Sequence, residues 1–341
     1  MGVRVAVAGA SGYGGGELLR LLSAHPEVEL AALGAGTSAG RRVTDVHPHL
    51  VSLSGRTFAA TDPAVLAEAD VVLLSLPHGE SATVAAGLPP GLPVLDLGAD
   101  FRLADAGEWH RWYGAEHPHA GTWAYGLPEL PGQRVRLAGA TRVALPGCYA
   151  TTVLLALAPL VAAGLLETDD LVVVAASGGS GAGRTGNAGL SGPEVMGDVS
   201  AYKPGAHQHT PEVVQALALL TRSPVSLSLT PMLVPMARGL LATCTARTSA
   251  TTAGLRDALA AAYSAEPLVH LLDGGSWPHT AATLGSGSCH VQATVGEGGR
   301  AVVVAALDNL GKGASAQAVQ VLNLILGLPE TLGVPVDGVA P

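Results

Sequence analysis

The sequence contains little charge, few aromatic side chains and little cysteine. Of its 341 residues, 13% are charged, 4% are aromatic and 3 are cysteines. Soluble domains carry about 25% charged residues, so the chain is poor in charge. Its 48% of hydrophobic residues suffices for a buried core and excludes a disordered chain. With 18 basic against 27 acidic residues, the net charge of −9 argues against a nucleic-acid partner. The length predicts about two domains.

The cysteines indicate a reducing compartment. Cys148, Cys244 and Cys289 are odd in number and far apart in the chain, which argues against a disulfide framework. Residues 1–7 lack the basic region, apolar core and cleavage site of a signal peptide. We therefore expect a cytoplasmic protein.

One stretch raises the question of a membrane span. Val143–Leu166 contains 24 residues without a formal charge, which is long enough to cross a bilayer. Pro146, Gly147 and Pro159 interrupt it, whereas bilayers demand uninterrupted apolar helices. We expect a strand end, a turn and a buried helix instead of a span.

The histidines show no metal-binding spacing. His110, His117 and His119 lie in a segment that contains Trp and Tyr, but neither Cys-x-x-Cys nor His-Glu-x-x-His spacing accompanies them. We expect these three to be structural or surface residues, and we expect no metal.

Two patterns divide the chain near residue 148. Before it, short apolar runs alternate with helical segments, which predicts a parallel sheet with crossover helices. After it, longer runs rich in Thr, Ser and Val are joined by turn residues, which predicts an antiparallel sheet. The expected strands are 4–8, 28–34, 71–76, 92–97, 171–176, 225–229, 239–247, 290–295 and 300–306, and the expected helices are 14–24, 63–69, 150–163, 255–262 and 314–326.

A glycine-rich turn follows the first expected strand. Gly9, Gly12 and Gly15, with Ser11, Tyr13 and Gly14 between them, connect residues 4–8 to the first helix. Glycines at such a turn let a pyrophosphate approach the helix N-terminus, where free N–H groups favour anions. The pattern is weak as a string, but its place in a βαβ unit predicts dinucleotide binding. The alternative is an ordinary turn in a chain that contains 45 glycines.

The end of the second expected strand indicates which dinucleotide binds. NAD sites place Asp or Glu there, whereas NADP sites use polar or basic groups for the 2′-phosphate. Here no acid precedes Asp45, and Thr37, Ser38 and either Arg41 or Arg42 are available. NADP is therefore favoured; the alternative is a solvent-exposed loop with ordinary arginines.

Cys148 is the candidate nucleophile. It opens an apolar helix after Leu-Pro-Gly, and a helix N-terminus favours the thiolate and offers N–H groups to an oxyanion. Cys244 and Cys289 fall inside strand-like runs and are expected to be buried. His207 and His209 both stand directly before a helix start, where a histidine can act as acid and base toward the thiol.

A second glycine-rich loop follows the expected strand 171–176. Residues 177–184 read Ser-Gly-Gly-Ser-Gly-Ala-Gly-Arg, and such a loop can hold a phosphate or the nicotinamide amide through its N–H groups. Two small anions are expected to be held by the glycine loops together with Arg41, Arg102 and Arg184.

These residues together resemble the N-acetyl-gamma-glutamyl-phosphate reductase family, which is related to aspartate-semialdehyde dehydrogenase. The resemblance covers nearly the whole chain. The blocks that carry it are Gly9–Tyr13, Leu76–Gly79, Asp100–Arg102, Tyr125–Glu129, Pro146–Tyr149, Ser180–Arg184, His209–Glu212 and Asp308–Gly313. In this order along one chain, the blocks are specific, although each alone would be weak.

The resemblance implies a fold and a chemistry. The fold is a Rossmann-type doubly wound NADP-binding domain, residues 1–147 with 312–341, plus an α+β catalytic and dimerisation domain with a mainly antiparallel sheet, residues 148–311. The chemistry is NADPH-dependent reduction of an acyl phosphate through a Cys148 thioester, with release of phosphate and formation of N-acetylglutamate 5-semialdehyde. His209 is implied as acid and base, and Glu212 as a residue near the substrate. The residues implied at NADP beyond those already named are Ser75, Pro77, His78, Ser177, Gly178, Gly181 and Asn309.

Two residues depart from the family pattern, and several alternatives stay open. Leu145 stands where Asn is usual, and Gly98 where Ser is usual. Within the enzyme class, N-acetyl-aminoadipyl phosphate and aspartyl phosphate are alternative substrates. Outside it, the alternative is a non-catalytic NADP-binding redox sensor, which the presence of both Cys148 and His209 argues against. An antiparallel sheet suits packing between copies, and a homodimer and a homotetramer are both open.

Overall fold

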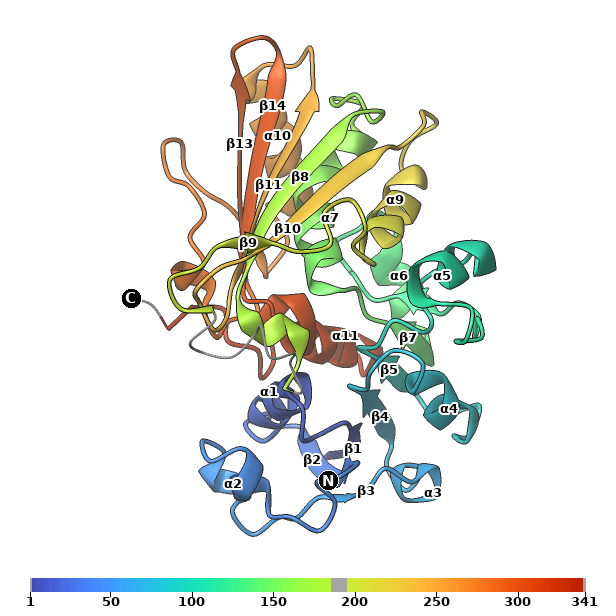
Figure 1. Ribbon diagram of the computed structural model, residues 1–341. Coiled ribbons are helices and arrows are strands. Elements are labelled where there is room, and N and C mark those ends of the chain that lie inside the picture. Colours follow the sequence, from blue (N-terminus) through green and yellow to red (C-terminus); the bar gives the residue numbers. More distant parts are fainter. Residues whose placement is uncertain (1, 185–194, 340–341) are drawn as a thin grey trace. The chain divides into compact units, whose positions relative to one another are not determined.

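The computed structural model describes residues 2–184 and 195–339 (Figure 1). By its internal contacts the chain divides into two compact units, each described by itself below. Unit 1 comprises Met1–Pro128, Gly132–Pro146 and Ala314–Val334, and unit 2 comprises Glu129–Pro131, Gly147–Gly313 and Pro335–Pro341.

Unit 1 is built on a sheet of seven strands in the order β3-β2-β1-β4-β5-β7-β6. All neighbouring pairs are parallel. The order reverses between β1 and β4, which is the topological switch point of a doubly wound fold. The strands are β1 (Val3–Ala8), β2 (Val28–Ala35), β3 (Ala59–Ala60), β4 (Val71–Leu74), β5 (Val94–Asp96), β6 (Ala124–Tyr125) and β7 (Arg142–Ala144). The predicted parallel sheet is confirmed, and β3 and β6 are short strands that the hydrophobic pattern did not predict.

The central strands of unit 1 are buried on both faces, which explains their continuous apolar runs. All four residues of β4 are buried, as are the last four of β1. The covering helices are α1 (Tyr13–Leu22), α2 (Val43–Val46), α3 (Pro63–Leu66), α4 (Ser81–Ala86), α5 (Ala106–Tyr113), α6 (Gln133–Leu137) and α11 (Ala316–Ile325). Helix α11 packs against α1 and α6, and the Ser315 hydroxyl donates to the Gly14 carbonyl at 3.0 Å.

Unit 2 contains a mixed, mainly antiparallel sheet in the order β12-β13-β14-β11-β8-β10-β9. Its strands are β8 (Leu171–Ser177), β9 (Ser200–Ala201), β10 (Leu227–Leu233), β11 (Leu240–Arg247), β12 (Val269–Leu271), β13 (Cys289–Gly296) and β14 (Arg300–Leu307). The prediction of antiparallel pairing was wrong for β10, which lies parallel to β8. Helix α9 (Thr210–Ala218) comes between β8 and β10 in the chain, and a crossover connection of this kind joins parallel strands.

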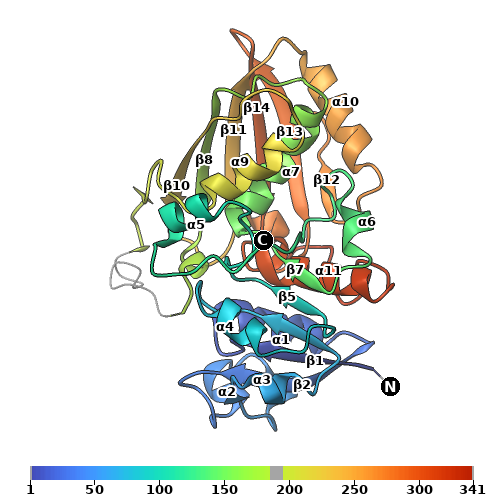
Figure 2. The ribbon, with the colours of Figure 1, turned by 90° about the vertical axis from the view of Figure 1, so that its right-hand side faces the viewer.

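Three helices cover one face of this sheet: α7 (Cys148–Ala162), α9 and α10 (Thr252–Tyr263) (Figure 2). Helix α7 is apolar all round and packs on β11 and β14. On the other face, side chains that alternate with the core residues stay partly exposed in the single chain. Val174, which is 47% exposed, Thr243 and Val304 stand next to one another in register across β8, β11 and β14.

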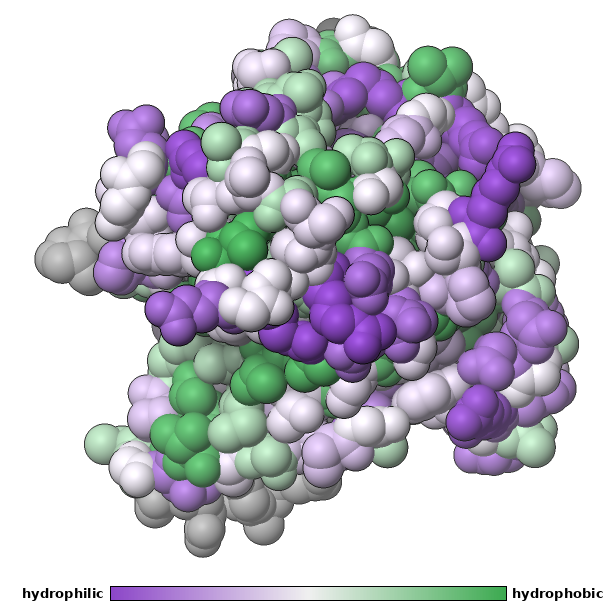
Figure 3. Space-filling view, turned by 90° about the horizontal axis from the view of Figure 1, so that it is seen from above, coloured by the Kyte–Doolittle hydropathy of each residue, from purple (hydrophilic) through white to green (hydrophobic). Residues whose placement is uncertain are grey.

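The charge-free stretch is the end of β7, a turn and helix α7, as predicted. Within the described part of the chain, no helix has both the length and the apolar character to cross a membrane. A view from above shows hydrophobic residues reaching the surface in several patches between hydrophilic ones (Figure 3).

The two departures from the family pattern are accommodated in unit 1. The Leu145 N–H donates to the Asp96 carbonyl at 2.8 Å, and its carbonyl accepts from Arg102 Nε at 2.8 Å, so this position acts through its backbone. A Cβ on Gly98 would lie 2.7 Å from Ser81 Oγ and 2.9 Å from Asp96 Oδ1. The hydroxyl and the carboxyl therefore fill the space that a larger residue would need.

Candidate active site

The first glycine turn is a backbone cradle in unit 1. Gly9 has a φ of +76°, and a Cβ on it would lie 2.1 Å from the Ser75 carbonyl oxygen. A Cβ on Gly15 would lie 2.2 Å from the Gly9 carbonyl oxygen. Side chains are thus excluded where β1, the end of β4 and the start of α1 meet. This is the close backbone approach that a pyrophosphate site requires, so these residues fit a dinucleotide.

The remaining predicted residues of this turn surround the start of α1. Gly12 is the N-cap, and the helix begins at Tyr13, which is 38% exposed. A Cβ on Gly14 would lie 2.8 Å from Ser75 Oγ, so the Ser75 hydroxyl lies directly against this glycine. Ser11, which precedes the N-cap, is half-buried. The structure therefore brings the end of β4 to the turn.

The loop after β2 lies at the same edge of the sheet. The Ala10 N–H donates to the Gly34 carbonyl at 2.9 Å, which joins the glycine turn to the end of β2. Thr37 and Arg41 are exposed and Ser38 is half-buried. The guanidinium of Arg41 donates to the Asp45 carbonyl at 3.4 Å.

The segment after β4 is held by Asp100. Its two carboxylate oxygens accept from the Gly79 N–H at 2.7 Å and the Ala82 N–H at 2.8 Å. The ring of His78, next to Pro77, lies 5.5 Å from the ring of Tyr113, centroid to centroid. Asp100 thus fixes the turn that presents Pro77 and His78.

The two predicted anion-binding arginines beyond the cofactor loop differ in surroundings. Arg102 is 6% exposed and donates to the carbonyls of Leu145 and Leu97, both at 2.8 Å. Through these bonds Arg102 links the segments that directly follow β5 and β7. Arg184 is exposed and is the last described residue before the undescribed segment 185–194.

The predicted nucleophile and the predicted base meet in unit 2. Cys148 is half-buried and is the first residue of α7, with Gly147 as its N-cap. His209 is the N-cap of α9, and a Cβ on Gly147 would lie 2.2 Å from His209 Nε2. The imidazole therefore lies against the Cα of the residue that precedes Cys148. A Cβ on Gly313 would lie 2.9 Å from Cys148 Cβ, so this glycine leaves room for the cysteine.

Glu212 joins the same two helices. It lies in the first turn of α9 and is 1% exposed, and its Oε1 accepts from the Gly147 N–H at 2.9 Å. A carboxylate in a first helical turn is favoured by the helix dipole. The carboxylate thus fixes the Pro146–Gly147 peptide, one residue before Cys148.

Tyr149, Tyr202 and His207 complete this cluster, and the sequence indicated no role for the tyrosines. The two hydroxyl oxygens are 2.5 Å apart. Burial raises the pKa of Tyr149 and also that of Tyr202, the latter to about 12. The nearby Cys148 acts in the same direction on both tyrosines, so both stay neutral near the thiol. The only sequence signal was the position of Tyr149 next to Cys148.

The structure separates the roles of the two candidate histidines. His207 is 8% exposed, and its Nδ1 accepts from the His209 N–H at 3.2 Å. Burial and the neighbouring His209 lower the pKa of His207 to about 3. A histidine with so low a pKa is a weak base near neutral pH, which favours His209 as the acid–base candidate.

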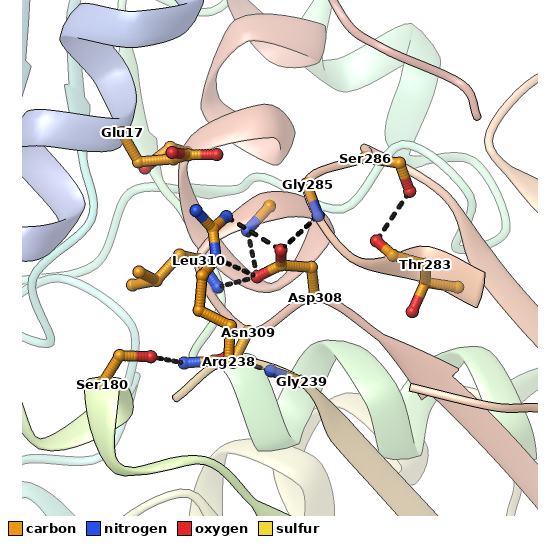
Figure 4. Close-up of polar contacts among 12 residues, drawn as sticks. Glu17, Ser180, Arg238, Gly239, Thr283, Gly285, Ser286, Asp308, Asn309 and Leu310 are labelled. Atoms are coloured by element: carbon orange, nitrogen blue, oxygen red, sulfur yellow. Dashed lines mark hydrogen bonds and ion pairs between the residues drawn. The ribbon is translucent and has the colours of Figure 1, made fainter. Parts of the chain in front are cut away.

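The second glycine loop is tied to the end of β14 through Asn309 (Figure 4). Asn309 Nδ2 donates to Ser180 Oγ at 3.0 Å, and its Oδ1 accepts from the Gly239 N–H at 2.8 Å. A Cβ on Gly178 would lie 2.8 Å from the Ala237 carbonyl, so this loop also needs a glycine. Ser177, at the end of β8, is 3% exposed. A Cβ on Gly181 would lie 3.6 Å from Asn309 Nδ2.

Asp308, next to Asn309, fixes three chain segments at once. It is fully buried and pairs with Arg238 at 2.8 Å. It also accepts from the N–H groups of Gly285 at 2.6 Å and Leu310 at 2.9 Å (Figure 4). Lys312, in the same Asp308–Gly313 block, forms a fully buried ion pair with Glu129 at 2.5 Å. The pair of Lys312 with Glu129 connects two of the sequence blocks that the resemblance singled out.

Cys244, Cys289 and His119 take structural places. Cys244 and Cys289 are fully buried, and burial raises the pKa of each thiol to about 12, as expected for core residues. His119 Nε2 lies 2.8 Å from the Leu103 carbonyl. Among the residues that the structure describes, no group of three or more His, Cys, Asp or Glu side chains is arranged to hold a metal ion.

Comparison with known proteins assigns the family. The model of the semialdehyde dehydrogenase NAD binding domain matches residues 4–138, and that of the semialdehyde dehydrogenase dimerisation domain matches residues 148–309. Proteins named N-acetyl-gamma-glutamyl-phosphate reductase from Acidothermus cellulolyticus and Salinispora tropica are each 59% identical, over 345 and 342 aligned residues and 100% of both chains. The chain belongs to the N-acetyl-gamma-glutamyl-phosphate reductase family. The family member from Streptomyces coelicolor is 54% identical, again over 100% of both chains.

Solved structures with this fold are more distant. Aspartate semialdehyde dehydrogenase II from Vibrio cholerae, complexed with ASA, has a TM-score of 0.69 at 18% identity, covering 96% of this chain and 99% of that one. Aspartate semialdehyde dehydrogenase from Candida albicans with NADP has a TM-score of 0.68 at 18% identity, covering 95% and 100%. At this identity the likeness supports the fold of the reductase, which confirms the predicted fold class.

Proposed function

We propose that the protein reduces N-acetyl-L-glutamyl 5-phosphate to N-acetyl-L-glutamate 5-semialdehyde with NADPH, releasing phosphate, as a step of arginine biosynthesis. The observation that carries the proposal is the contact of the His209 imidazole with Gly147, directly before Cys148 at the start of α7. The names of the full-length relatives support the substrate.

Cys148 begins the reaction as the nucleophile. Its thiolate attacks the carbonyl carbon of the acyl phosphate, and a C–S bond forms while the carbonyl electrons move to oxygen. The first N–H groups of a helix lack intrahelical acceptors, and those at the start of α7 are suited to stabilise this oxyanion. When the carbonyl re-forms, the C–O bond to phosphate breaks, and a thioester and inorganic phosphate result.

Reduction then converts the thioester to an aldehyde. NADPH, when bound, would supply a hydride to the thioester carbonyl carbon, which leaves a thiohemiacetal oxyanion on the carbon joined to Cys148. His209 in its protonated form donates a proton to this oxygen, and as a neutral base it takes the proton back when the C–S bond breaks. Cys148 leaves as the thiolate and is ready for another cycle. Glu212 holds the Gly147 peptide and thereby the start of α7 through these steps.

The choice of NADPH over NADH rests on the loop after β2. A carboxylate there would repel the 2′-phosphate, and residues 36–44 contain none, whereas they offer Thr37, Ser38 and Arg41. Each of the two arginines donates to one backbone carbonyl, Arg41 to that of Asp45 at 3.4 Å and Arg42 to that of Ser54 at 3.3 Å. The remaining parts of NADPH, its phosphates and its nicotinamide, are assigned to the first glycine turn and to Ser75, Pro77, His78, Ser177, Gly178, Gly181 and Asn309. Arg102 and Arg184 are assigned to the acyl phosphate substrate.

The assay runs the reaction backward, as phosphate-dependent reduction of NADP by N-acetylglutamate semialdehyde. We expect Cys148→Ala to abolish activity while NADPH binding is retained. Cys244→Ala removes a buried thiol in the same unit and serves as the matched control, which should stay active. Full activity of the Cys148→Ala variant would refute the thioester route. Binding of NADPH without any thioester in the unmodified protein would instead favour a redox sensor.

The acyl tail is tested by kinetics with three aldehydes. We expect the highest kcat/KM for N-acetylglutamate semialdehyde, ahead of N-acetyl-aminoadipate semialdehyde and aspartate semialdehyde. A higher value for either of the others would reassign the substrate. We also propose that the protein works in the cytoplasm, a reducing compartment in which its three free cysteines would stay reduced.

The open face of the sheet in unit 2 is assigned to contact with a second copy of the chain. The family model for the dimerisation domain matches residues 148–309, which include this face. Val174, Thr243 and Val304 lie side by side on this face. We expect Val174→Asp to shift the molar mass measured by light scattering toward the monomer. Val51→Asp, at a position that is 74% exposed in unit 1, is the control that keeps the assembly. An unchanged mass for Val174→Asp would move the interface elsewhere.

A further inference from the structure

His47 is a buried histidine that the reaction above does not use. It directly follows α2, is 1% exposed, and places its Nε2 2.9 Å from the Ala10 carbonyl oxygen in the middle of the first glycine turn. A carbonyl oxygen only accepts hydrogen bonds, so Nε2 carries the proton and donates.

The imidazole of His47 packs against Gly16. A Cβ on Gly16 would lie 2.4 Å from His47 Cε1, 2.7 Å from Nδ1 and 3.0 Å from Nε2. The ring of Phe58 packs edge-on, with its centroid 6.1 Å from that of His47. Gly16 therefore extends the glycine run by one residue beyond the nucleotide-binding pattern, and its lack of a side chain is what admits the imidazole.

The hydrogen bond from His47 sets the direction of one peptide in the turn. In a trans peptide the C=O and the following N–H point in opposite directions. Ala10 is held at both ends, because its N–H donates to the Gly34 carbonyl at 2.9 Å while its carbonyl accepts from His47. The N–H of Ser11 must then point away from His47, toward the other side of the turn.

We infer that His47 is a positioning residue for the cofactor pyrophosphate: by holding the Ala10 carbonyl it aims the Ser11 N–H into the glycine cradle. The inference rests on the proposed binding of NADPH at this turn. His47 does not touch the reacting atoms, so its loss should weaken cofactor binding and leave the chemistry of the bound complex intact.

Three variants separate this role from general stability. His47→Phe keeps a planar ring on Gly16 but removes the donor. His47→Gln restores a donor at a similar reach. His49→Phe is the matched control, because His49 lies two residues away, is exposed, and contacts the His47 ring edge-on at 5.8 Å between centroids. In Gly16→Ala the new Cβ would overlap the His47 ring and displace it. This variant tests the hydrogen bond between His47 and Ala10 if His47→Phe fails to fold.

The readouts are dissociation constants for NADPH and for adenosine 2′-monophosphate, which lacks the pyrophosphate, together with kcat at saturating NADPH. Loss of one hydrogen bond that orders a binding group corresponds to a Kd change of about tenfold. For His47→Phe and Gly16→Ala we expect that weakening for NADPH, with the affinity for adenosine 2′-monophosphate and kcat within about twofold of the unmodified protein. His47→Gln should recover most of the NADPH affinity, and His49→Phe should not lose it.

Equal weakening of both ligands, or unchanged NADPH affinity in His47→Phe, would overturn the inference. An unmodified protein that binds no NADPH would overturn the proposed function itself, so the two failures are distinguishable.

Discussion

Glu212 Oε1 accepts a hydrogen bond from the backbone N–H of Gly147 at 2.9 Å, although 65 residues separate the two. The bond connects the first turn of α9 to Gly147, the N-cap of α7, and Cys148 is the first residue of that helix. The candidate nucleophile Cys148, the candidate base His209 and the Glu212 carboxylate therefore lie together at the N-termini of α7 and α9 in unit 2.

Removing the Glu212 carboxylate should impair the reaction through the position of Cys148. We expect Glu212→Ala to lower kcat/KM for phosphate-dependent NADP reduction by roughly 10- to 100-fold, since a buried hydrogen bond to a charged group is lost. Glu212→Gln keeps an acceptor oxygen and should lose less. A Glu212→Gln variant that is as slow as Glu212→Ala would show that the charge, and not the hydrogen bond to Gly147, is what matters.

A side chain at position 147 should displace the base. In Gly147→Ala the new Cβ would overlap the His209 ring, which must then move. We expect kcat to fall by at least about 100-fold, the usual contribution of general acid–base catalysis, with NADPH affinity unchanged in a fluorescence titration. Gly274→Ala is the control, because a Cβ there meets nothing within 4 Å. Near-normal kcat in Gly147→Ala would mean that the His209 ring can shift without consequence.

His207 should make the fold less stable in mild acid. Its pKa is about 3 in the folded chain against 6.5 ordinarily, with burial as the main cause and His209 as the next. Between these values the unfolded chain binds a proton that the folded chain does not, so the free energy of unfolding falls as pH falls. We expect the Tm of His207→Gln, relative to the unmodified protein, to rise from pH 7.5 to pH 5. Parallel Tm profiles would contradict this.

Asp96 should act with the opposite sign over the same interval. It is fully buried at the end of β5, and burial raises its pKa from 3.8 to about 7 against the hydrogen bonds from Ser81 and Gly98. Between pH 4 and 7 the folded chain keeps a proton that the unfolded chain has released, so the free energy of unfolding falls as pH rises. The Tm of Asp96→Asn, relative to the unmodified protein, should therefore increase from pH 5 to pH 7.5. A relative Tm that falls or stays level would show that Asp96 is ionised in the folded protein.

The local features of the site were readable in the sequence. The glycines of the first turn follow an apolar strand, Cys148 opens an apolar helix after Pro-Gly, and His209 precedes Thr-Pro at a helix start. Such signals depend on the backbone conformation of a few neighbouring residues, which short patterns encode. The direction of β10 was mispredicted, because hydrophobic alternation shows that a strand exists and not which way it runs beside its neighbour.

Contacts between distant segments carried no such signal. Nothing near His47 indicates that its ring lies on Gly16, and nothing near Tyr202 indicates that its hydroxyl meets that of Tyr149. The resemblance implied His209 as acid and base, but the local sequence does not distinguish it from His207; the structure adds that burial lowers the pKa of His207.

The sequence by itself determined the two kinds of sheet, the first glycine turn and the candidate nucleophile, because strand runs, glycine spacing and helix starts are local properties of the backbone. The tertiary structure alone decided which side chains act together: Glu212 with Gly147, His209 against the start of α7, and His47 beneath Ala10. The physical reason is that a hydrogen bond or a pKa depends on what surrounds a group in space, and only packing brings residues from distant parts of the chain within that range.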